Sequence, residues 1–328
     1  METKERNYEI VLERGLLRHV RDYIPHENVY ILTDDGVPSL YKDDLRRAFP
    51  EAPLFEMKQG EVHKNIDTYQ DIVRDMLEKR VSRKDILIAL GGGVVGDMGG
   101  FVSATYMRGI PYINIPTTFL SQVDSSIGGK TGLDFGGVKN SLGAFHQPSL
   151  VLIDPDTLDT LSERQLHNGL AEAVKMGITG DRELFEILER EDYEKHIEEI
   201  IERCLLYKRK IVREDERETG IRKILNFGHT IGHAYEAYYK GDYLHGECVA
   251  AGMMKILDEG EVRDRLRRVL ERLDLPRELQ ADPKQLKALM QNDKKADHDT
   301  VTVILADEIG KGRLEEWPME KLYRRIGA

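Results

Sequence analysis

The chain has 328 residues, of which 40% are hydrophobic and 33% are charged, and its net charge at pH 7 is −11. This length predicts two domains, and the negative charge argues against a broad surface for nucleic acid or anionic membranes. The two cysteines cannot build a disulfide framework, the first residues contain no apolar signal segment, and no apolar run is long enough to span a bilayer. We therefore expect a soluble, cytoplasmic protein.

The first half of the chain alternates short apolar segments with amphipathic segments of helical period. Strands are expected at residues 28–34, 52–57, 85–90, 112–118 and 149–155, and helices at 39–49, at 68–80 and directly after the glycines at 91–93. Such alternation predicts a parallel or mixed sheet that is covered by helices on both faces. The fold class expected for this half is a Rossmann-like α/β domain.

The pattern changes after Asp154-Pro155. From residue 162 to about 297 the sequence reads as helix almost without interruption, and the next convincing strand is at residues 301–306. We therefore expect an α/β domain at 1–155 and a mostly α-helical domain at 156–328, with the active site in the cleft between them.

A glycine turn follows the apolar segment at 85–90. Gly91, Gly93 and Gly96 spell G-x-G-x-x-G at the start of a helix, where backbone N–H groups suit a pyrophosphate. The alternative is a tight strand-to-helix turn that needs glycine only for close packing. The motif also differs from the usual Rossmann version, because several strands precede it and Asp97 follows at once.

Residues 119–148 are rich in glycine and show no clear period. This segment carries Asp124, Lys130, Lys139 and Asn140, and its lysines are either solvated or placed to hold a phosphate. Arg108 occupies a similar position near the preceding strand. Further along, Lys208 and Arg222 flank the highly charged segment at 213–218, and the simplest interpretation is that both side chains are solvated.

Histidines and acidic residues concentrate in the second half. His229 and His233 are four residues apart and share one face of a helix, with Glu236 near that face and His245 after a short turn. Imidazoles are the most common ligands of divalent metals, and spacing alone favours His229 and His233 as the ligand pair. The alternative is that each histidine is an ordinary core or surface residue. Upstream, Glu172 and Lys175 share a face of an otherwise apolar helix, where a carboxylate needs a partner and a metal is a suitable one.

Several of these segments together resemble the 3-dehydroquinate synthase family of the sugar-phosphate cyclase superfamily. The resemblance runs from about residue 60 to residue 254 and rests on GGGVVGD, RGIPYINIPTT, VDSSIGGKTG, KNSLGAFHQP, GLAEAVKMG, LNFGHTIGHAYE and LHGE. It implies an NAD-dependent and metal-dependent carbon–oxygen lyase of the shikimate pathway, which leads to aromatic amino acids. Its substrate would be 3-deoxy-arabino-heptulosonate 7-phosphate, and its products 3-dehydroquinate and phosphate.

The resemblance also assigns residues. It implies that Glu172, His229 and His245 hold zinc or cobalt, and that His233 faces the substrate instead. The implied NAD contacts are Glu61, Lys64, Gly91, Gly92, Gly93, Gly96, Asp97, Thr117, Thr118, Lys130, Lys139, Thr157 and Thr160. The implied substrate-site residues are Asp124, Lys130, Asn140, Lys175, Lys208, Arg222, Asn226 and His233, with Lys294 and Lys295 matching a late lysine pair. Arg108 matches an arginine that reaches a neighbouring subunit's site, which implies a homodimer.

The chain departs from the family pattern in one loop. Asp134 stands where the family usually has Asn, and residues 135–138 read Phe-Gly-Gly-Val in place of His-Pro-Leu-Gly. Three other functions remain open at this point. They are a related cyclase for a sugar phosphate without a carboxylate, a metal-dependent polyol dehydrogenase, and a binding module without activity.

Overall fold

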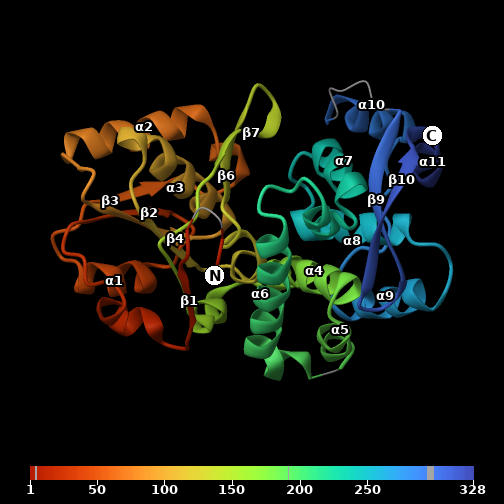
Figure 1. Cartoon of the computed structure of the whole chain (residues 1–328), viewed down its shortest axis with the longest axis horizontal. Coiled ribbons are helices and arrows are strands. Elements are labelled where there is room, and N and C mark those ends of the chain that lie inside the picture. Colours follow the sequence, from red (N-terminus) through yellow and green to blue (C-terminus); the bar gives the residue numbers. More distant parts are fainter. Residues whose placement is uncertain (4–5, 191, 294–298) are drawn as a thin grey trace. The chain divides into compact units, whose positions relative to one another are not determined.

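The computed structural model describes residues 1–3, 6–190, 192–293 and 299–328 (Figure 1). They form two compact units, residues 1–162 and residues 163–328. The boundary lies later than the 155/156 expected from the sequence, because residues 155–160 pack with the first unit, where the Tyr41 hydroxyl donates to the Asp156 carbonyl at 3.0 Å. In the described ranges no helix is long and apolar enough to cross a membrane.

The first unit contains a parallel sheet of six strands in the order β1-β8-β5-β4-β2-β3. Its strands are β1 (Glu9–Leu12), β2 (Val29–Asp34), β3 (Leu54–Met57), β4 (Ile86–Gly91), β5 (Tyr112–Pro116) and β8 (Leu150–Ile153). The helices of this unit are α1 (Ser39–Ala48), α2 (Ile66–Glu78) and α3 (Gly93–Thr105), with short turns η1 (Leu16–Asp22), η2 (Glu61–His63), η3 (Tyr106–Arg108), η4 (Ser121–Ser125) and η5 (Pro155–Thr160). The expected α/β class with a parallel sheet is confirmed.

Helices cover both faces of this sheet (Figure 1). Alternate residues of β2 point to opposite sides, so Ile31 lies in one apolar cluster with Leu45 of α1, while Leu32 lies in another with Met76 of α2. Burial on both faces explains why the strands read as continuous apolar runs.

The glycine-rich segment folds into an antiparallel hairpin that the sequence did not predict. Strand β6 (Lys130–Phe135) pairs with β7 (Val138–Phe145). The two residues between them, Gly136 and Gly137, have φ of 64° and 77°, which a tight hairpin turn of this kind requires. Strand β7 is exposed over most of its length, so it shows no alternation of apolar and polar residues.

The second unit is mostly helical, as expected. It comprises α4 (Glu163–Thr179), α5 (Arg182–Leu188), α6 (Ile197–Glu214), α7 (His229–Tyr239), α8 (His245–Ile256), α9 (Glu261–Arg272), α10 (Pro283–Asp293) and α11 (Met319–Ile326), with turns η6 (Tyr193–His196) and η7 (Ile221–Asn226) and a hairpin of β9 (Thr300–Glu308) and β10 (Lys311–Pro318). Helix α4 is buried all round from residue 167 to 179 and packs against α5, α6 and α8. Strand β10, like β1, was missed because charged residues interrupt its apolar pattern.

Candidate functional site

In the first unit, the expected cofactor residues gather at the carboxyl ends of three adjacent strands. The glycine turn follows β4, Thr117 and Thr118 follow β5, and Thr157 follows β8. The Thr117 N–H donates to the Gly91 carbonyl at 2.9 Å, which joins the first two of these loops. In open parallel sheets, ligands bind at this edge.

The glycine turn is packed too tightly for side chains. A Cβ on Gly91 would lie 2.6 Å from Val95 Cγ2, and one on Gly92 would lie 3.1 Å from Thr118 Cγ2. The strand–turn–helix context that a dinucleotide site requires is present, since α3 begins at Gly93 directly after the turn. Packing thus accounts for Gly91, while the first N–H groups of α3, which have no acceptor within the helix, keep the pyrophosphate interpretation open.

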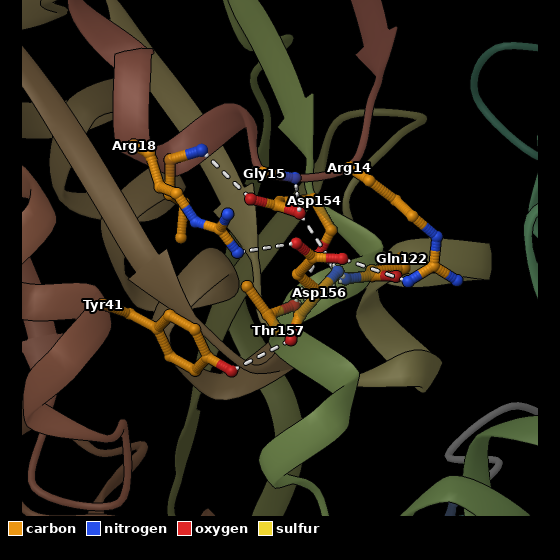
Figure 2. Close-up of polar contacts among 9 residues, drawn as sticks. Arg14, Gly15, Arg18, Tyr41, Gln122, Asp154, Asp156 and Thr157 are labelled. Atoms are coloured by element: carbon orange, nitrogen blue, oxygen red, sulfur yellow. Dashed lines mark hydrogen bonds and ion pairs between the residues drawn. The ribbon is translucent and has the colours of Figure 1, made fainter.

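The loop after β8 is held by a buried polar network (Figure 2). The Asp154 carboxylate accepts hydrogen bonds from the Gly15 and Leu17 N–H groups at 2.8 and 3.0 Å. Gln122 Nε2 donates to the Asp154 carbonyl at 3.1 Å and to the Thr157 hydroxyl at 2.9 Å (Figure 2). The Thr157 side chain is therefore buried and engaged within the unit, whereas Thr160 lies at the surface.

Lys64 is a buried cation beside the glycine turn. Its Nζ lies 2.6 Å from Asp97 Oδ2 and 3.7 Å from Glu61 Oε1, and the residue is 3% exposed. Burial lowers the pKa of Lys64, but the carboxylates of Asp97 and Glu61 outweigh this effect and raise the net pKa. Lys64 is thus a fixed positive charge, and Asp97 of the glycine motif is its ion-pair partner.

The other substrate and cofactor candidates of this unit lie around the hairpin and on short turns. Lys130 and Lys139 are exposed on β6 and β7, and Asp124 is partly buried on η4. Arg108 is exposed and has left-handed backbone geometry, with φ of 71° next to Met107 with φ of 50°. Two consecutive non-glycine residues in this region are strained, and such strain often marks a functional position.

In the second unit, Glu172, His229 and His245 converge although they are far apart in the sequence. Glu172 Oε1 lies 3.6 Å from His229 Nε2 and 3.4 Å from His245 Nε2, and the Glu172 side chain is fully buried. Each residue of this group offers one ligand atom, and these atoms lie within 4.8 Å of one another. The three side chains come from α4 and from the first residues of α7 and α8.

Both imidazoles are held so that their Nε2 lone pairs face Glu172. His229 Nδ1 donates to the Phe227 carbonyl at 3.1 Å, and His245 Nδ1 donates to Glu236 Oε1 at 3.2 Å. Because each acceptor can only accept, each Nδ1 carries the proton and each Nε2 is left without one in the neutral ring. Metal-binding histidines are oriented by partners of this kind.

The group has the properties that a divalent cation requires. Glu172 Oε1 is buried and accepts no hydrogen bond from the described residues. Two ligand atoms on a tetrahedral zinc lie about 3.4 Å apart, which matches both carboxylate–imidazole distances. One carboxylate and two imidazoles also leave the fourth position for a substrate, as in catalytic zinc sites.

The charges of the group agree with this interpretation. Burial raises the pKa of Glu172, but Lys175 and His229 reverse the effect, and the net pKa falls well below its usual range. Burial lowers the pKa of His229 to about 3, so the ring is neutral. Burial also lowers the pKa of His245, but its contacts with the carboxylates of Glu172 and Glu236 raise it to about 10. The two carboxylates thus stabilise positive charge at His245, which a bound cation also supplies.

Lys175 and His233 lie next to this group in different ways. Lys175 Nζ contacts Glu172 Oε2, so the two carboxylate oxygens are divided between the ammonium and the imidazoles. His233 is half-exposed, and its Nε2 lies 4.0 Å from Glu236 Oε2. The His229–His233 pair that helical spacing favoured is therefore not the pair that faces Glu172. His233 belongs to a second group with Glu236 and His245.

Residues of helix α4 bind the start of α8 through hydrogen bonds and an ion pair, and these contacts set the position of His245. Arg164 Nε and Nη2 lie 2.7 and 2.8 Å from the two carboxylate oxygens of Glu247, and the Gly246 N–H donates to Asn168 Oδ1 at 2.6 Å. A Cβ on Gly246 would lie 1.9 Å from the Asn168 carbonyl oxygen, so only glycine permits this approach. The sequence did not indicate these supporting residues, because each contact joins segments about 80 residues apart.

The basic candidates for a carboxylate lie on α6 and η7. Lys208 and Arg222 are buried, and Asn226 is partly buried. The Arg222 guanidinium donates to the Glu216 carbonyl, so the charged segment folds over it rather than leaving it in solvent. A buried guanidinium is well suited to a planar anion. Lys294 and Lys295 lie outside the described residues.

Comparisons with known proteins agree along nearly the whole chain. Residues 54–168 match the model of the 3-dehydroquinate synthase N-terminal domain, and residues 169–296 match that of the C-terminal domain. A 3-dehydroquinate synthase of Clostridium beijerinckii is 38% identical, and the match covers 98% of both chains.

Solved structures of sugar-phosphate cyclases are also similar. A 2-epi-5-epi-valiolone synthase from Streptomyces hygroscopicus, with NAD+ and Zn2+ bound, gives a TM-score of 0.88 at 29% identity over 99% of this chain and 96% of that one. A 2-deoxy-scyllo-inosose synthase, in complex with carbaglucose-6-phosphate, NAD+ and Co2+, gives 0.85 at 25% identity over 97% and 95%.

Proposed function

The chain belongs to the 3-dehydroquinate synthase family, and from this premise we propose which of its residues perform each part of the reaction. It is an NAD-dependent carbon–oxygen lyase of the shikimate pathway that converts 3-deoxy-arabino-heptulosonate 7-phosphate into 3-dehydroquinate and phosphate. Its cofactors are NAD and a divalent cation, zinc or cobalt.

Glu172, His229 and His245 would hold the cation through Oε1 and the two Nε2 atoms. When bound, the cation lowers the pKa of the substrate's carbon-5 hydroxyl and prepares that carbon for hydride loss. Lys175 keeps Glu172 Oε2 away from the other ligands, so that Glu172 presents one oxygen. The fully buried carboxylate and the neutral His229 ring form a site that is fixed before the substrate arrives.

The loops at the carboxyl ends of β4, β5 and β8 would bind NAD, with the pyrophosphate at the start of α3. Held there, the nicotinamide would supply reversible hydride transfer at carbon 5, and the cofactor would not be consumed. The buried charge of Lys64 and its partner Asp97 shape the edge of this site.

The two ends of the substrate are anionic and need different partners. Arg222, Lys208 and Asn226 would hold the carboxylate, and the guanidinium suits a two-pronged hydrogen bond. Lys130 and Asn140 on the hairpin would hold the phosphate, together with Arg108 from a second copy of the chain. We therefore propose a homodimer in which Arg108 completes the partner's site.

Proton transfer falls to groups beside the proposed ligands. His233 lies on α7 with its Nε2 near Glu236 and is accessible to a substrate, while Lys175 is buried against Glu172. Both are candidates for moving protons and orienting hydroxyl groups, with Asp124 as a further polar contact. We also propose that the protein works in the cytoplasm, where its two buried cysteines stay reduced.

The convergence of two imidazole Nε2 atoms on the buried Glu172 Oε1, 3.6 and 3.4 Å away, carries this proposal. A phosphate-release assay with and without a chelator tests it, and release that is indifferent to chelation contradicts it. A related cyclase that acts on a sugar phosphate without a carboxylate remains the second candidate, because two such cyclases are among the similar solved structures. Equal turnover of a sugar 7-phosphate without the carboxylate would favour that candidate, since Arg222 would then have no anion to bind.

A further inference from the structure

Asp134 lies where this chain departs from the family pattern. It stands at the end of β6, at the irregularity in register between Leu133 and Phe135, and it is partly buried. The two-residue turn at Gly136 and Gly137 follows directly, so Asp134 faces the residues that begin β7.

Three hydrogen bonds join Asp134, Asn140 and Lys64 in a closed ring. The Asp134 N–H donates to the Lys64 carbonyl at 2.8 Å, and the Asn140 N–H donates to Asp134 Oδ1 at 2.8 Å. Lys64 Nζ then donates to Asn140 Oδ1 at 2.7 Å. Each residue is both a donor and an acceptor, so the hairpin is fastened to the segment before α2 on both strands.

The ring holds Asn140 in an unusual conformation. Its φ is 51°, a left-handed geometry that asparagine tolerates better than other non-glycine residues but that still needs support. A carboxylate that accepts from the Asn140 N–H provides this support. The turned backbone also directs the amide oxygen of Asn140 at Lys64.

Lys64 extends the ring to the glycine turn. Its buried Nζ is shared between Asn140 and Asp97, the residue that closes the GGGVVGD motif on α3. The hairpin and the turn are therefore connected through one ammonium group.

We propose that Asp134 is a positioning residue, which fixes Asn140 for the phosphate group of the substrate and ties the hairpin to the cofactor turn through Lys64. The proposal rests on the proposed function for the role of Asn140 as a phosphate contact. It does not require Asp134 to touch any ligand. The two-residue turn at 136–137 joins β6 and β7 in the register in which Asp134 and Asn140 meet.

Two substitutions at this position and one control test the proposal in the full-length enzyme. D134A removes the acceptor, whereas D134N restores the side chain usual in the family and keeps an oxygen that accepts from the Asn140 N–H. Ser141→Ala is the matched control, because the Ser141 hydroxyl donates to the Phe135 carbonyl at 2.9 Å in the same hairpin but outside the ring.

The two readouts are hydrogen exchange of the backbone amides of the β6–β7 hairpin, measured in the full-length enzyme, and steady-state kinetics. In D134A the Asn140 amide should exchange at least about threefold faster, and KM for the phosphorylated substrate should rise roughly three- to tenfold, as expected for one lost hydrogen bond at a partly exposed position. We expect kcat to change less than KM, because Asn140 would contact the phosphate on carbon 7, whereas hydride transfer takes place at carbon 5. D134N should recover most of both effects, and Ser141→Ala should leave KM within about twofold of the parent.

Unchanged exchange at Asn140 in D134A would overturn the ring, whatever the enzyme's substrate proves to be. Faster exchange with an unchanged KM would overturn the positioning role. A wild-type protein that releases no phosphate would count against the proposed function instead, and the exchange readout together with the affinity for inorganic phosphate, measured by calorimetry, would then decide the inference. In that case the inference requires phosphate to bind more weakly to D134A than to D134N.

Discussion

Glu236 offers the sharpest test of how the proposed metal site is built. Its carboxylate accepts from His245 Nδ1 at 3.2 Å, and its side chain is 9% exposed, whereas His229 is held by a backbone carbonyl that no substitution removes. Glu236→Ala therefore frees one of the two imidazoles and leaves the other in place. The sequence placed Glu236 near the face of His229 and His233 but gave it no role.

The size of the effect follows from that hydrogen bond. A charged hydrogen bond contributes about 1.5–3 kcal/mol, and the partial exposure of His245 favours the lower half of this range. Loss of a partner of this type typically weakens a metal site about 10- to 100-fold. We expect a chelator to remove zinc from Glu236→Ala about ten to thirty times faster than from the parent, and from Glu236→Gln less than tenfold faster, because the amide oxygen still accepts.

The removal rate is measured by mixing the zinc-loaded protein with a chromogenic chelator. It reports on the metal-bound protein, so protonation of His245 in the metal-free protein does not enter. Glu278→Gln is the control, since Glu278 pairs with Lys255 at 3.0 Å on the exposed surface. Equal rates for Glu236→Ala and the parent, with the control also unchanged, would refute the role given to Glu236.

Three further outcomes are expected. Gly246→Ala should destabilise the second unit by about 3 kcal/mol or more in chemical denaturation, since the new Cβ meets the Asn168 carbonyl oxygen at 1.9 Å. Gly241→Ala, with open space around it, should cost about 1 kcal/mol, and equal losses in the two variants would contradict the close approach. Arg222→Lys should raise KM for the acid substrate about tenfold, because a lysine cannot form the two-pronged contact, and an unaltered KM would remove Arg222 from the carboxylate site. Chelation should abolish phosphate release, zinc or cobalt should restore it, and no NADH should accumulate at 340 nm; NADH in step with turnover would favour a polyol dehydrogenase.

The sequence predicted the sheet well because its strands are buried on both faces. Continuous apolar runs such as 85–90 leave little choice of structure, and β4 begins one residue later than expected. The hairpin of β6 and β7 was missed for the opposite reason, since its outer strand is exposed and its glycines obscure any period.

The candidate site was predictable only in part from the residues themselves. Helical spacing brought His229 and His233 together, but spacing within one helix contains no information about Glu172, which approaches from a helix about 60 residues earlier. The residues themselves made Glu172 and His245 candidates, the resemblance to a family selected them with His229 as the ligands in place of His233, and the structure brings both next to His229. Metal binding by these three residues remains a prediction.

The ring of hydrogen bonds around Asp134 could not be predicted from the sequence either. Its three members are separated by up to 76 residues, and only one of its bonds joins residues of the same hairpin. No periodicity or motif links Lys64 to Asn140, because the contact arises from how the hairpin packs on the segment before α2.

The central claim is that one carboxylate and two imidazoles form the metal site. The most direct test is a crystal structure of the zinc-loaded protein with anomalous data at the zinc edge. We predict one strong peak about 2.0–2.2 Å from Glu172 Oε1, His229 Nε2 and His245 Nε2. A peak on His233 and Glu236 with none at Glu172, or no peak in this unit, would contradict it.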